Sequence, residues 1–470
     1  MGLTDTVVAE LDAARRRSLM LLEPLDEPAL VRQHSPLMSP LVWDLAHVGN
    51  YEDQWLLRAV GAPGARPDLD GVYDAFRHPR PNRPALPLLS PVEARAYLAD
   101  VRTRALDALH GAGLDALDAR RRDDLDPARP RGARGGPAPD GGLLDGGFVY
   151  AMVVQHEHQH VETMLATLQL ASLPLTTTPP TTVLGTRRAP GAAVPAAGGA
   201  GRGDEGPAAD DVLVEGGTCI IGTSADRWAY DNEGPAHEVD LASFRIDTTP
   251  VTNRAYAEFV DDGGYHARRW WTDQGWDHRR TAGLEHPQFW RRDGPTWARE
   301  RFGVVEPLPL DEPVQHVCWY EADAYARWAG RRLPTEPEWE KAASWDPATG
   351  RQRRYPWGDT PPGPGRANLG GDSFGPAPAA VRRGGASAYG CHQLLGDVWE
   401  WTSSDFAPYP GFSSFPYREY SEVFFGADHK VLRGGSWATH PSAVRATFRN
   451  WDLPVRRQIF AGFRTAIDAR

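Results

Sequence analysis

Cysteine is scarce in this chain of 470 residues, which has only Cys219, Cys318 and Cys391. The three are far apart and none belongs to a CxxC pair. This spacing excludes a disulfide-stabilised scaffold and a zinc site built from thiolates, and it fits a reducing compartment. We therefore expect the three cysteines to act as small core residues.

An excess of positive charge and long apolar runs are also missing. The chain has 51 Lys and Arg against 62 Asp and Glu, a formal net charge of −11, so neither nucleic acid nor an anionic membrane is an expected partner. The N-terminal segment MGLTDTVVAELDAARRRSLMLL is amphipathic and carries early acids, unlike a signal peptide, and no later run is long enough to span a bilayer. We expect a cytoplasmic protein that acts on small molecules as a monomer.

The first part of the chain, residues 1–173, predicts a four-helix bundle. It is rich in leucine and alanine, and its apolar residues recur at helical spacing. Ser90 and Glu93 form a capping box at the start of one of the helices. Four long helices are predicted, at residues 3–24, 39–60, 90–112 and 146–173. Helices connected in this way are typical of a bundle.

The remainder of the chain differs in composition and in the pattern of its apolar residues. Residues 174–211 contain TTTPPTT and a run rich in Ala, Gly and Pro, which predicts a linker; the similar stretch 113–145 predicts a loop. In residues 212–470, short β-branched stretches alternate with Gly, Pro and most of the 17 tryptophans. This pattern predicts a loop-rich α+β domain whose core depends on tryptophan.

The segment HEHQHVET, residues 156–163, places three histidines and a glutamate in an otherwise apolar helix. Side chains four residues apart lie about 40° from each other around a helix, so His156 and His160 share a face, while His158 and Glu162 point about 200° away from His160. Two buried imidazoles repel each other when charged, and each needs a partner when neutral. A divalent metal ion meets both demands; a pair of hydrogen-bonded core histidines is the alternative.

A third ligand is predicted from the second helix. Its segment PLVWDLAHVGNYEDQWLL has His47 as its only histidine, among apolar residues. Three histidines without a coordinating carboxylate would leave open positions on the metal, as substrate and dioxygen chemistry requires. The nitrogen donors suit zinc, iron or copper, and the spacing does not choose among them.

These features resemble the hercynine oxygenases, which are iron(II)-dependent sulfoxide synthases of ergothioneine biosynthesis. His47 with His156-x-x-x-His160-x-Glu162 resembles their DinB-like bundle. Almost all of residues 212–466 resembles the formylglycine-generating-enzyme (sulfatase-modifying factor) domain, which has a C-type-lectin-like fold. The matching segments run in the order of that family: EGGTCIIGT, NEGPAHEVDLASFRID, PVTNRAYAEFV, PVQHVCWYEADAYARWAGRRLPTEPEWEKAA, YPWG, QLLGDVWEWTSS, VLRGGSWAT and AGFRTA.

The copper oxidases that make formylglycine carry catalytic cysteines near the C-terminus, whereas no cysteine follows Cys391 here. The resemblance therefore implies the scaffold without the copper chemistry. It implies a reaction in which Fe(2+) and dioxygen join the thiol of γ-glutamylcysteine to the imidazole of hercynine and oxidise the sulfur to a sulfoxide. Iron would bring the reactants together in one site.

The resemblance also implies roles for individual residues. Tyr417 corresponds to the catalytic proton donor. The residues that correspond to γ-glutamylcysteine contacts are Arg80, Arg83, Asp452 and Arg456. The residues that correspond to hercynine contacts are Gln159, Tyr420, Asn450 and Trp451. The site is therefore expected between the two halves of the chain.

Three other functions are compatible with parts of this pattern. Related sulfoxide synthases use cysteine, another thiol or a selenium donor. A zinc-dependent thiol transferase built on the same DinB-like bundle would also use three histidines, but it would not need the C-terminal half. A non-catalytic module with a lectin-like fold would leave His47, His156 and His160 unexplained.

Overall fold

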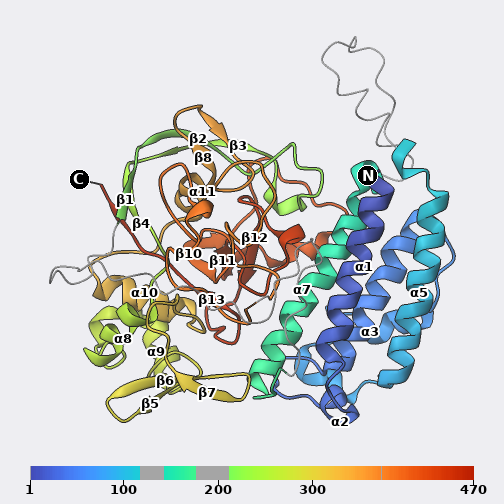
Figure 1. Cartoon of the computed structure of the whole chain (residues 1–470), viewed down its shortest axis with the longest axis horizontal. Helices are drawn as coiled ribbons and strands as arrows, with labels where there is room; N and C mark the ends of the chain where they lie inside the picture. Colours follow the sequence, from blue (N-terminus) through green and yellow to red (C-terminus); the bar gives the residue numbers. More distant parts are fainter. Residues whose placement is uncertain (1, 117–141, 176–210, 372, 470) are drawn as a thin grey trace, which may run out of the picture.

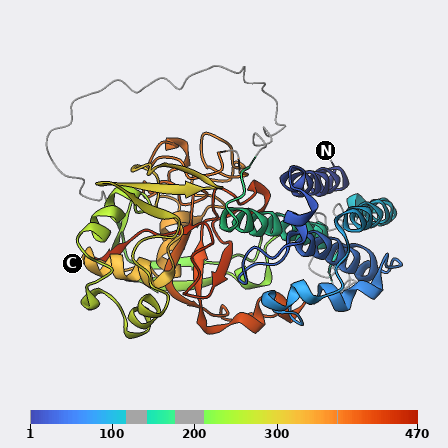
Figure 2. The ribbon, with the colours of Figure 1, turned by 90° about the horizontal axis from the view of Figure 1, so that it is seen from below.

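The computed structural model describes residues 2–116, 142–175, 211–371 and 373–469. Most of the predicted 174–211 linker and most of the predicted 113–145 loop lie outside these described residues, and β1 begins at Asp211, the last residue of the predicted linker. The described part forms two bodies side by side, a group of long helices and a larger half with sheets and loops (Figures 1 and 2). No described helix has the length and apolar character needed to cross a membrane.

The N-terminal half contains the four long helices that the sequence predicts. They are α1 (Leu3–Leu22), α3 (Leu41–Glu52), α5 (Pro91–Gly111) and α7 (Phe148–Leu170). Shorter elements connect them: α2 (Glu27–Val31), η1 (Asp53–Leu57), η2 (Arg58–Val60), η3 (Pro67–Leu69), α4 (Asp70–Tyr73), η4 (Arg80–Ala85) and η5 (Asp145–Gly147). At the start of α5, Ser90 N donates to the Glu93 carboxylate over 2.9 Å, and Glu93 N donates to Ser90 Oγ over 3.3 Å.

A buried ion network joins the four long helices. Arg15 of α1 contacts Glu52 of α3 at 2.5 Å and Glu157 of α7 at 2.8 Å. Arg102 of α5 contacts the same two carboxylates, at 2.6 and 3.3 Å. Each charge has a partner of opposite sign, as buried charges require. Glu157, the first acid of the HEHQHVET segment, therefore belongs to the core of the bundle.

The C-terminal half is built on a mixed four-stranded sheet with the order β12-β11-β10-β13. Its strands are β10 (Trp399–Phe406), β11 (Gly426–Arg433), β12 (Arg449–Asp452) and β13 (Ala461–Gly462). The other described strands are β1 (Asp211–Val214), β2 (Gly217–Ile221), β3 (His237–Leu241), β4 (Phe244–Asp247), β5 (Trp290–Asp293), β6 (Thr296–Arg301), β7 (Val304–Pro307), β8 (Trp345–Asp346), β9 (Arg351–Gln352) and β14 (Ala466–Asp468). The described helices are α8 (Asn253–Asp261), α9 (Asp273–Thr281), α10 (Trp319–Trp328) and α11 (Glu336–Ser344).

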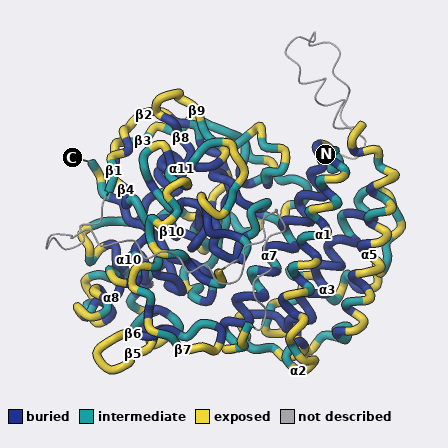
Figure 3. The backbone as a smooth tube through the Cα atoms, viewed as in Figure 1, coloured by how far each residue is buried: buried dark blue, intermediate teal, exposed yellow. Residues whose placement is uncertain are grey.

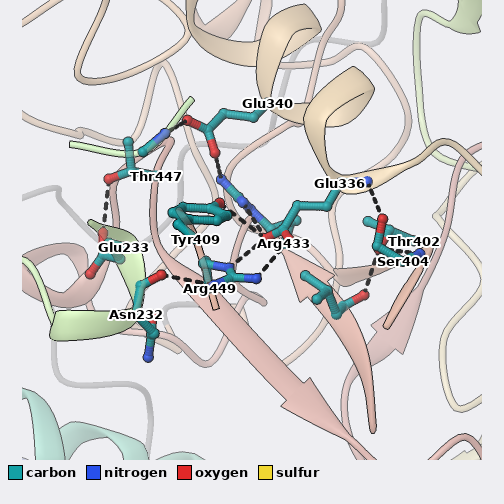
Figure 4. Close-up of polar contacts among 12 residues, drawn as sticks. Asn232, Glu233, Glu336, Glu340, Thr402, Ser404, Tyr409, Arg433, Thr447 and Arg449 are labelled. Carbon is teal, nitrogen blue, oxygen red and sulfur yellow. Dashed lines mark hydrogen bonds and ion pairs between the residues drawn. The ribbon is translucent and has the colours of Figure 1, made fainter. Parts of the chain in front are cut away.

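Tryptophans and ion pairs fill the core of this half. Trp339 and Trp401 are fully buried, and all three cysteines are free and buried. Buried Arg433 contacts Glu336 and Glu340 at 2.7 Å each, and Arg449 contacts Glu336 at 2.7 Å (Figure 4). These pairs join α11 to β11 and β12. The sheet therefore has a fixed position relative to the helix that covers it.

Helix α7 lies between the two halves and is buried along most of its length (Figure 3). The bundle covers one face of the helix, where α7 packs against α1 and α3. Its other face meets the C-terminal half, including η11 (Pro441–Ala443). A helix covered on both sides can present different side chains to each neighbour, and α7 does so in the HEHQHVET segment.

Candidate metal centre

Three histidines from two helices meet inside the bundle. His47 comes from α3, and His156 and His160 come from α7. Their ring centroids are 5.1 Å (His47–His156), 4.8 Å (His47–His160) and 4.6 Å (His156–His160) apart. One nitrogen of each ring lies within 4.8 Å of the others, so one ion could contact all three. The structure thus brings together the three predicted ligands, called the histidine triad below.

Hydrogen bonds orient two rings of the triad. His47 Nδ1 lies 2.7 Å from the carbonyl oxygen of Tyr73, and His160 Nδ1 lies 3.1 Å from Asp44 Oδ1. These acceptors favour the tautomer with its proton on Nδ1, which leaves Nε2 free to bind a metal. Within the described chain, buried His156 Nδ1 has no hydrogen-bond partner.

The surroundings keep two rings of the triad uncharged. Burial, and then the neighbouring histidines, lower the pKa of His47 and of His156 well below the usual value. Both rings are therefore neutral at pH 7 and have lone pairs available for an ion. Aromatic rings fix their positions: His47 stacks on Trp43 at 4.6 Å, and His156 stacks on Tyr51 at 3.7 Å. Three imidazoles with oriented rings fit a divalent transition metal.

His158 and Glu162 point away from the triad, as their helical spacing predicts. The Glu162 carboxylate accepts hydrogen bonds from Trp399 Nε1 at 2.7 Å, Ser436 Oγ at 2.6 Å and Thr439 Oγ1 at 2.8 Å. All three donors belong to the C-terminal half. Glu162 therefore links the helix of the triad to that half.

Tyr417 approaches the triad through another tyrosine. It precedes η9 (Arg418–Tyr420), and its hydroxyl lies 3.0 Å from the hydroxyl of Tyr51. The ring of Tyr51 is the one that stacks on His156, and the ring of Tyr417 packs on Trp55 at 5.1 Å. Burial raises the pKa of Tyr417 well above its usual range, so the hydroxyl keeps its proton at neutral pH.

Three of the four predicted hercynine contacts form a continuous group. Gln159 Nε2 donates to the Tyr420 hydroxyl over 3.4 Å, and Tyr420 meets Trp451 edge to face at 5.9 Å. Tyr420 also stacks on Tyr230 at 4.1 Å. The fourth, Asn450, precedes Trp451 in β12, and its side-chain oxygen accepts a hydrogen bond from the Trp451 backbone N–H.

Three of the four predicted donor contacts lie near one another where the halves meet. Arg456 Nε lies 3.4 Å from Asp452 Oδ1. Arg80 and Arg456 both donate to the carbonyl oxygen of Leu37, at 3.2 and 3.5 Å. Burial raises the pKa of Asp452, and the charges of Arg456 and Arg80 oppose this shift. The group combines two cations with one acid.

Arg83 is held differently from these three residues. Its guanidinium donates to the carbonyl oxygen of His78, to Ser39 Oγ and to the carbonyl oxygen of Ala75, at 3.0, 2.6 and 3.3 Å. It also lies 3.6 Å above the ring of Trp43, the residue that stacks on His47. Burial lowers the pKa of Arg83 to about 10. Its contacts with protein support the wall of the triad, so it is not a free partner for Arg80.

Sequence reasoning missed two aromatic residues of the site. Tyr51 follows His47 by one helical turn, so its position on the same face was a usable signal. Tyr230 precedes η6 (Asp231–Glu233) and is far in sequence from Tyr420. No pattern in the sequence connects Tyr230 with Tyr420, because their contact depends on how the loops fold.

Two family profiles match the chain. The DinB superfamily matches residues 10–164, and the Sulfatase-modifying factor enzyme 1-like domain matches residues 199–469. Together with the architecture, they confirm the predicted fold class: a DinB-like helical half followed by a formylglycine-generating-enzyme-like half. The second half alone is 34% identical to the formylglycine-generating enzyme of Streptomyces coelicolor, over 59% of this chain and 97% of that protein.

Full-length relatives carry both halves. The chain is 49% identical to the hercynine oxygenase of Mycolicibacterium smegmatis, over 99% of each chain. It is 50% identical to the hercynine oxygenase of Mycolicibacterium thermoresistibile, over 98% of this chain and 94% of that protein. Likeness at this level and over this length shows common membership. The chain belongs to the hercynine oxygenase family.

Proposed function

We propose that the chain is a non-haem iron(II) oxygenase that joins γ-glutamylcysteine to hercynine and gives γ-glutamyl-hercynylcysteine sulfoxide, a step of ergothioneine biosynthesis. The names of its full-length relatives support hercynine and oxygen as reactants. The observation that carries the proposal is that Tyr51, which stacks on His156 of the triad, also meets Tyr417 of the C-terminal half through its hydroxyl. A metal site that served the bundle alone would not need Tyr417.

His47, His156 and His160 would hold the iron. Iron(II) bound there would supply the redox chemistry that activates dioxygen and would give the thiol a place beside it. Three protein ligands leave positions for reactants, and the neutral rings suit the ion. Asp44 and the Tyr73 carbonyl keep the ring nitrogens of His160 and His47 in the tautomer that binds.

Tyr417 would hold a proton close to the reacting groups and could donate it during the reaction. Its raised pKa keeps the hydroxyl protonated, and general acids of this kind act when they lie close to the reacting group. The bond to the Tyr51 hydroxyl and the stack on Trp55 restrict how the Tyr417 ring can turn. Tyr51 would therefore align Tyr417 relative to the triad.

Hercynine has a trimethylammonium group, a carboxylate and an imidazole. The faces of Tyr420 and Trp451 offer the electron-rich surroundings that bind quaternary ammonium groups. The amides of Gln159 and Asn450 can donate hydrogen bonds to the polar groups of this substrate. Because Gln159 precedes His160 on α7, it would place hercynine beside the triad.

The thiol donor would lie against Arg80, Asp452 and Arg456. A γ-glutamyl group carries both an ammonium and carboxylates, which match one acid and two cations. Arg83 is close enough to Arg80 for their charges to interact, so it would add to the positive field at the carboxylates. Free cysteine or a selenium donor would use less of this surface.

A direct test is to load the metal-free protein with iron(II) under anaerobic conditions and then add dioxygen, hercynine and one thiol at a time. The products are identified by mass spectrometry. The sulfoxide keeps one oxygen atom of each dioxygen and the other leaves as water, so ¹⁸O₂ should label the product once. We expect γ-glutamylcysteine to be used in preference to cysteine.

The zinc-loaded protein is the matched control. A zinc-dependent thiol transferase would form product with zinc and without dioxygen, whereas the proposed oxygenase would form none under either condition. A strong preference for free cysteine would contradict the choice of donor while leaving the oxygenase intact.

A further inference from the structure

A second cluster of metal-binding side chains lies on the other side of α7 from the triad. It consists of Glu10 from α1, His158 from α7 and His440 immediately before η11. One ligand atom of each residue lies within 4.8 Å of the others. Among the described residues, only this cluster and the histidine triad bring three such groups so close together. Neither the proposed reaction nor its substrates use these residues.

The cluster contains buried polar atoms that the protein does not satisfy. His158 is 1% exposed, and its Nε2 atom has no hydrogen-bond partner in the described structure. Oε2 of Glu10 is likewise buried and unpartnered there. Leaving such atoms unpaired destabilises the folded state. A bound ion or water molecule between them would supply the missing partner for both.

The chemistry of the donors identifies the class of occupant. Two imidazoles and a carboxylate form a donor set that binds zinc and other divalent first-row metals. The rings of His158 and His440 stack at 3.7 Å with their planes 13° apart, so one ring must turn before both can bind the same ion. His440 Nδ1 lies 2.7 Å from Ser442 Oγ and accepts a hydrogen bond from the Ser442 backbone N–H at 3.3 Å. An ion on Nε2 would therefore require the ring proton to move to Nδ1 and point toward Ser442 Oγ.

We propose that Glu10, His158 and His440 form a second divalent transition-metal site, of the kind that zinc occupies, between the bundle and the C-terminal half. An ion there would connect α1 and α7 to the segment that leads into η11. Its role would be to hold the two halves together, because Glu10 and His158 belong to the bundle and His440 belongs to the C-terminal half. The site does not depend on the proposed oxygenase activity.

One neighbouring group opposes the binding of a cation. Arg17 Nη1 lies 3.5 Å from His158 Nδ1, and Arg17 also donates to the carbonyl oxygen of Ala438. A guanidinium at this distance repels a metal ion, so this site should bind more weakly than the triad. Because of this repulsion, removing the charge of Arg17 should strengthen the binding of a metal ion.

Zinc titration of metal-free protein, followed by equilibrium dialysis and elemental analysis, tests the site. The starting variant is His47→Ala/His156→Ala, which removes two ligands of the triad, and we expect it to bind one zinc per chain. Adding His440→Ala should abolish that zinc. Zinc should also raise the melting temperature of the first variant but not of the second. Failure of the starting variant to bind zinc, or binding that survives His440→Ala, would overturn the proposal.

Two further variants distinguish a loss of metal binding from a loss of folding or of activity. Arg17→Gln, added to the starting variant, should tighten zinc binding by about tenfold. Unchanged or weaker binding would mean that a water molecule and hydrogen bonds occupy the cluster instead. His440→Ala alone should leave iron binding at the triad unchanged, which separates this site from the triad.

Discussion

The two halves of the molecule hold their site residues by different means. The bundle places its three histidines on α3 and α7, and partners within the same half orient His47 and His160. The C-terminal half places Tyr417 and Tyr420 beside the short η9 and fixes them by packing against other aromatic rings. The candidate metal centre is thus complete within the bundle. The proposed substrate surface requires residues of both halves.

This difference predicts which properties a substitution in each half should change. A change on the triad should remove both metal and activity. A change in the C-terminal half should alter the reaction or the affinity for substrate while the metal stays bound. The following variants test that division.

The largest effect is expected for His156→Ala. Removing one of three ligands should abolish iron binding at the triad and, with it, product formation. Iron per chain is measured after anaerobic loading, in a His440→Ala background that leaves only the triad to be counted. His158→Ala in the same background should retain iron, because His158 lies on the opposite face of α7. Equal loss of iron in both variants would refute the geometry.

Tyr417→Phe should have the next largest effect, without loss of iron. The change keeps the ring on Trp55 but removes the hydroxyl that meets Tyr51. We expect C–S coupling to fall by about 10²–10⁴-fold, the usual range for a missing general acid. The bound thiol would then be oxidised to a sulfinate instead, which mass spectrometry detects.

Tyr420→Phe is the matched control for Tyr417. It removes a hydroxyl that accepts from Gln159, on the side expected to bind hercynine. It should raise the hercynine concentration needed for half-maximal rate without producing sulfinate. If Tyr417→Phe formed sulfoxide at close to the normal rate, Tyr417 would have no part in the chemistry.

Asp452→Asn should act on the thiol donor. A hydrogen bond from an ammonium to a carboxylate contributes ~1.5–3 kcal/mol, so the apparent affinity for γ-glutamylcysteine should fall about 10–150-fold. Hercynine use should change much less, because Asp452 lies with Arg456 and Arg80, whereas Gln159 contacts Tyr420. Steady-state kinetics with each substrate varied in turn measures both effects. An equal loss for the two substrates would indicate a general distortion of β12.

The same contrast explains what could be predicted from the sequence. In the bundle, apolar spacing and caps predict the helices, and the positions of His156 and His160 within one helix predict that they share a face. The link from His47 to them needed only the assumption that the helices pack together. Such inferences are possible because, in a regular helix, the number of residues between two positions sets the angle between their side chains.

The C-terminal half offers no such rule. Tyr420 and Tyr230 stack although they are far apart in the chain. The loops of the N-terminal half behave in the same way, since Arg83 turns toward Trp43 instead of joining Arg80. Contacts between loops depend on the whole fold, so composition and spacing could not predict them. The assignments of Tyr417, Asn450, Trp451 and Asp452 came from resemblance, and their roles remain to be tested by the variants described here.

The smallest effect is expected for Glu162→Gln, which tests the connection between the halves. Glu162 lies two residues after His160, yet its carboxylate accepts from Trp399, Ser436 and Thr439 of the other half. An amide of similar size keeps one acceptor oxygen but replaces the other with a donor that faces donors. We expect product formation to fall about tenfold, at the low end for groups that support metal ligands. Iron content should stay unchanged, whereas the hercynine requirement should rise because the substrate surface is displaced from α7. Glu162→Ala should give a larger change of the same kind. Loss of iron in Glu162→Gln would instead mean that metal binding at the triad depends on the C-terminal half. Metal binding would then not be a property of the bundle alone.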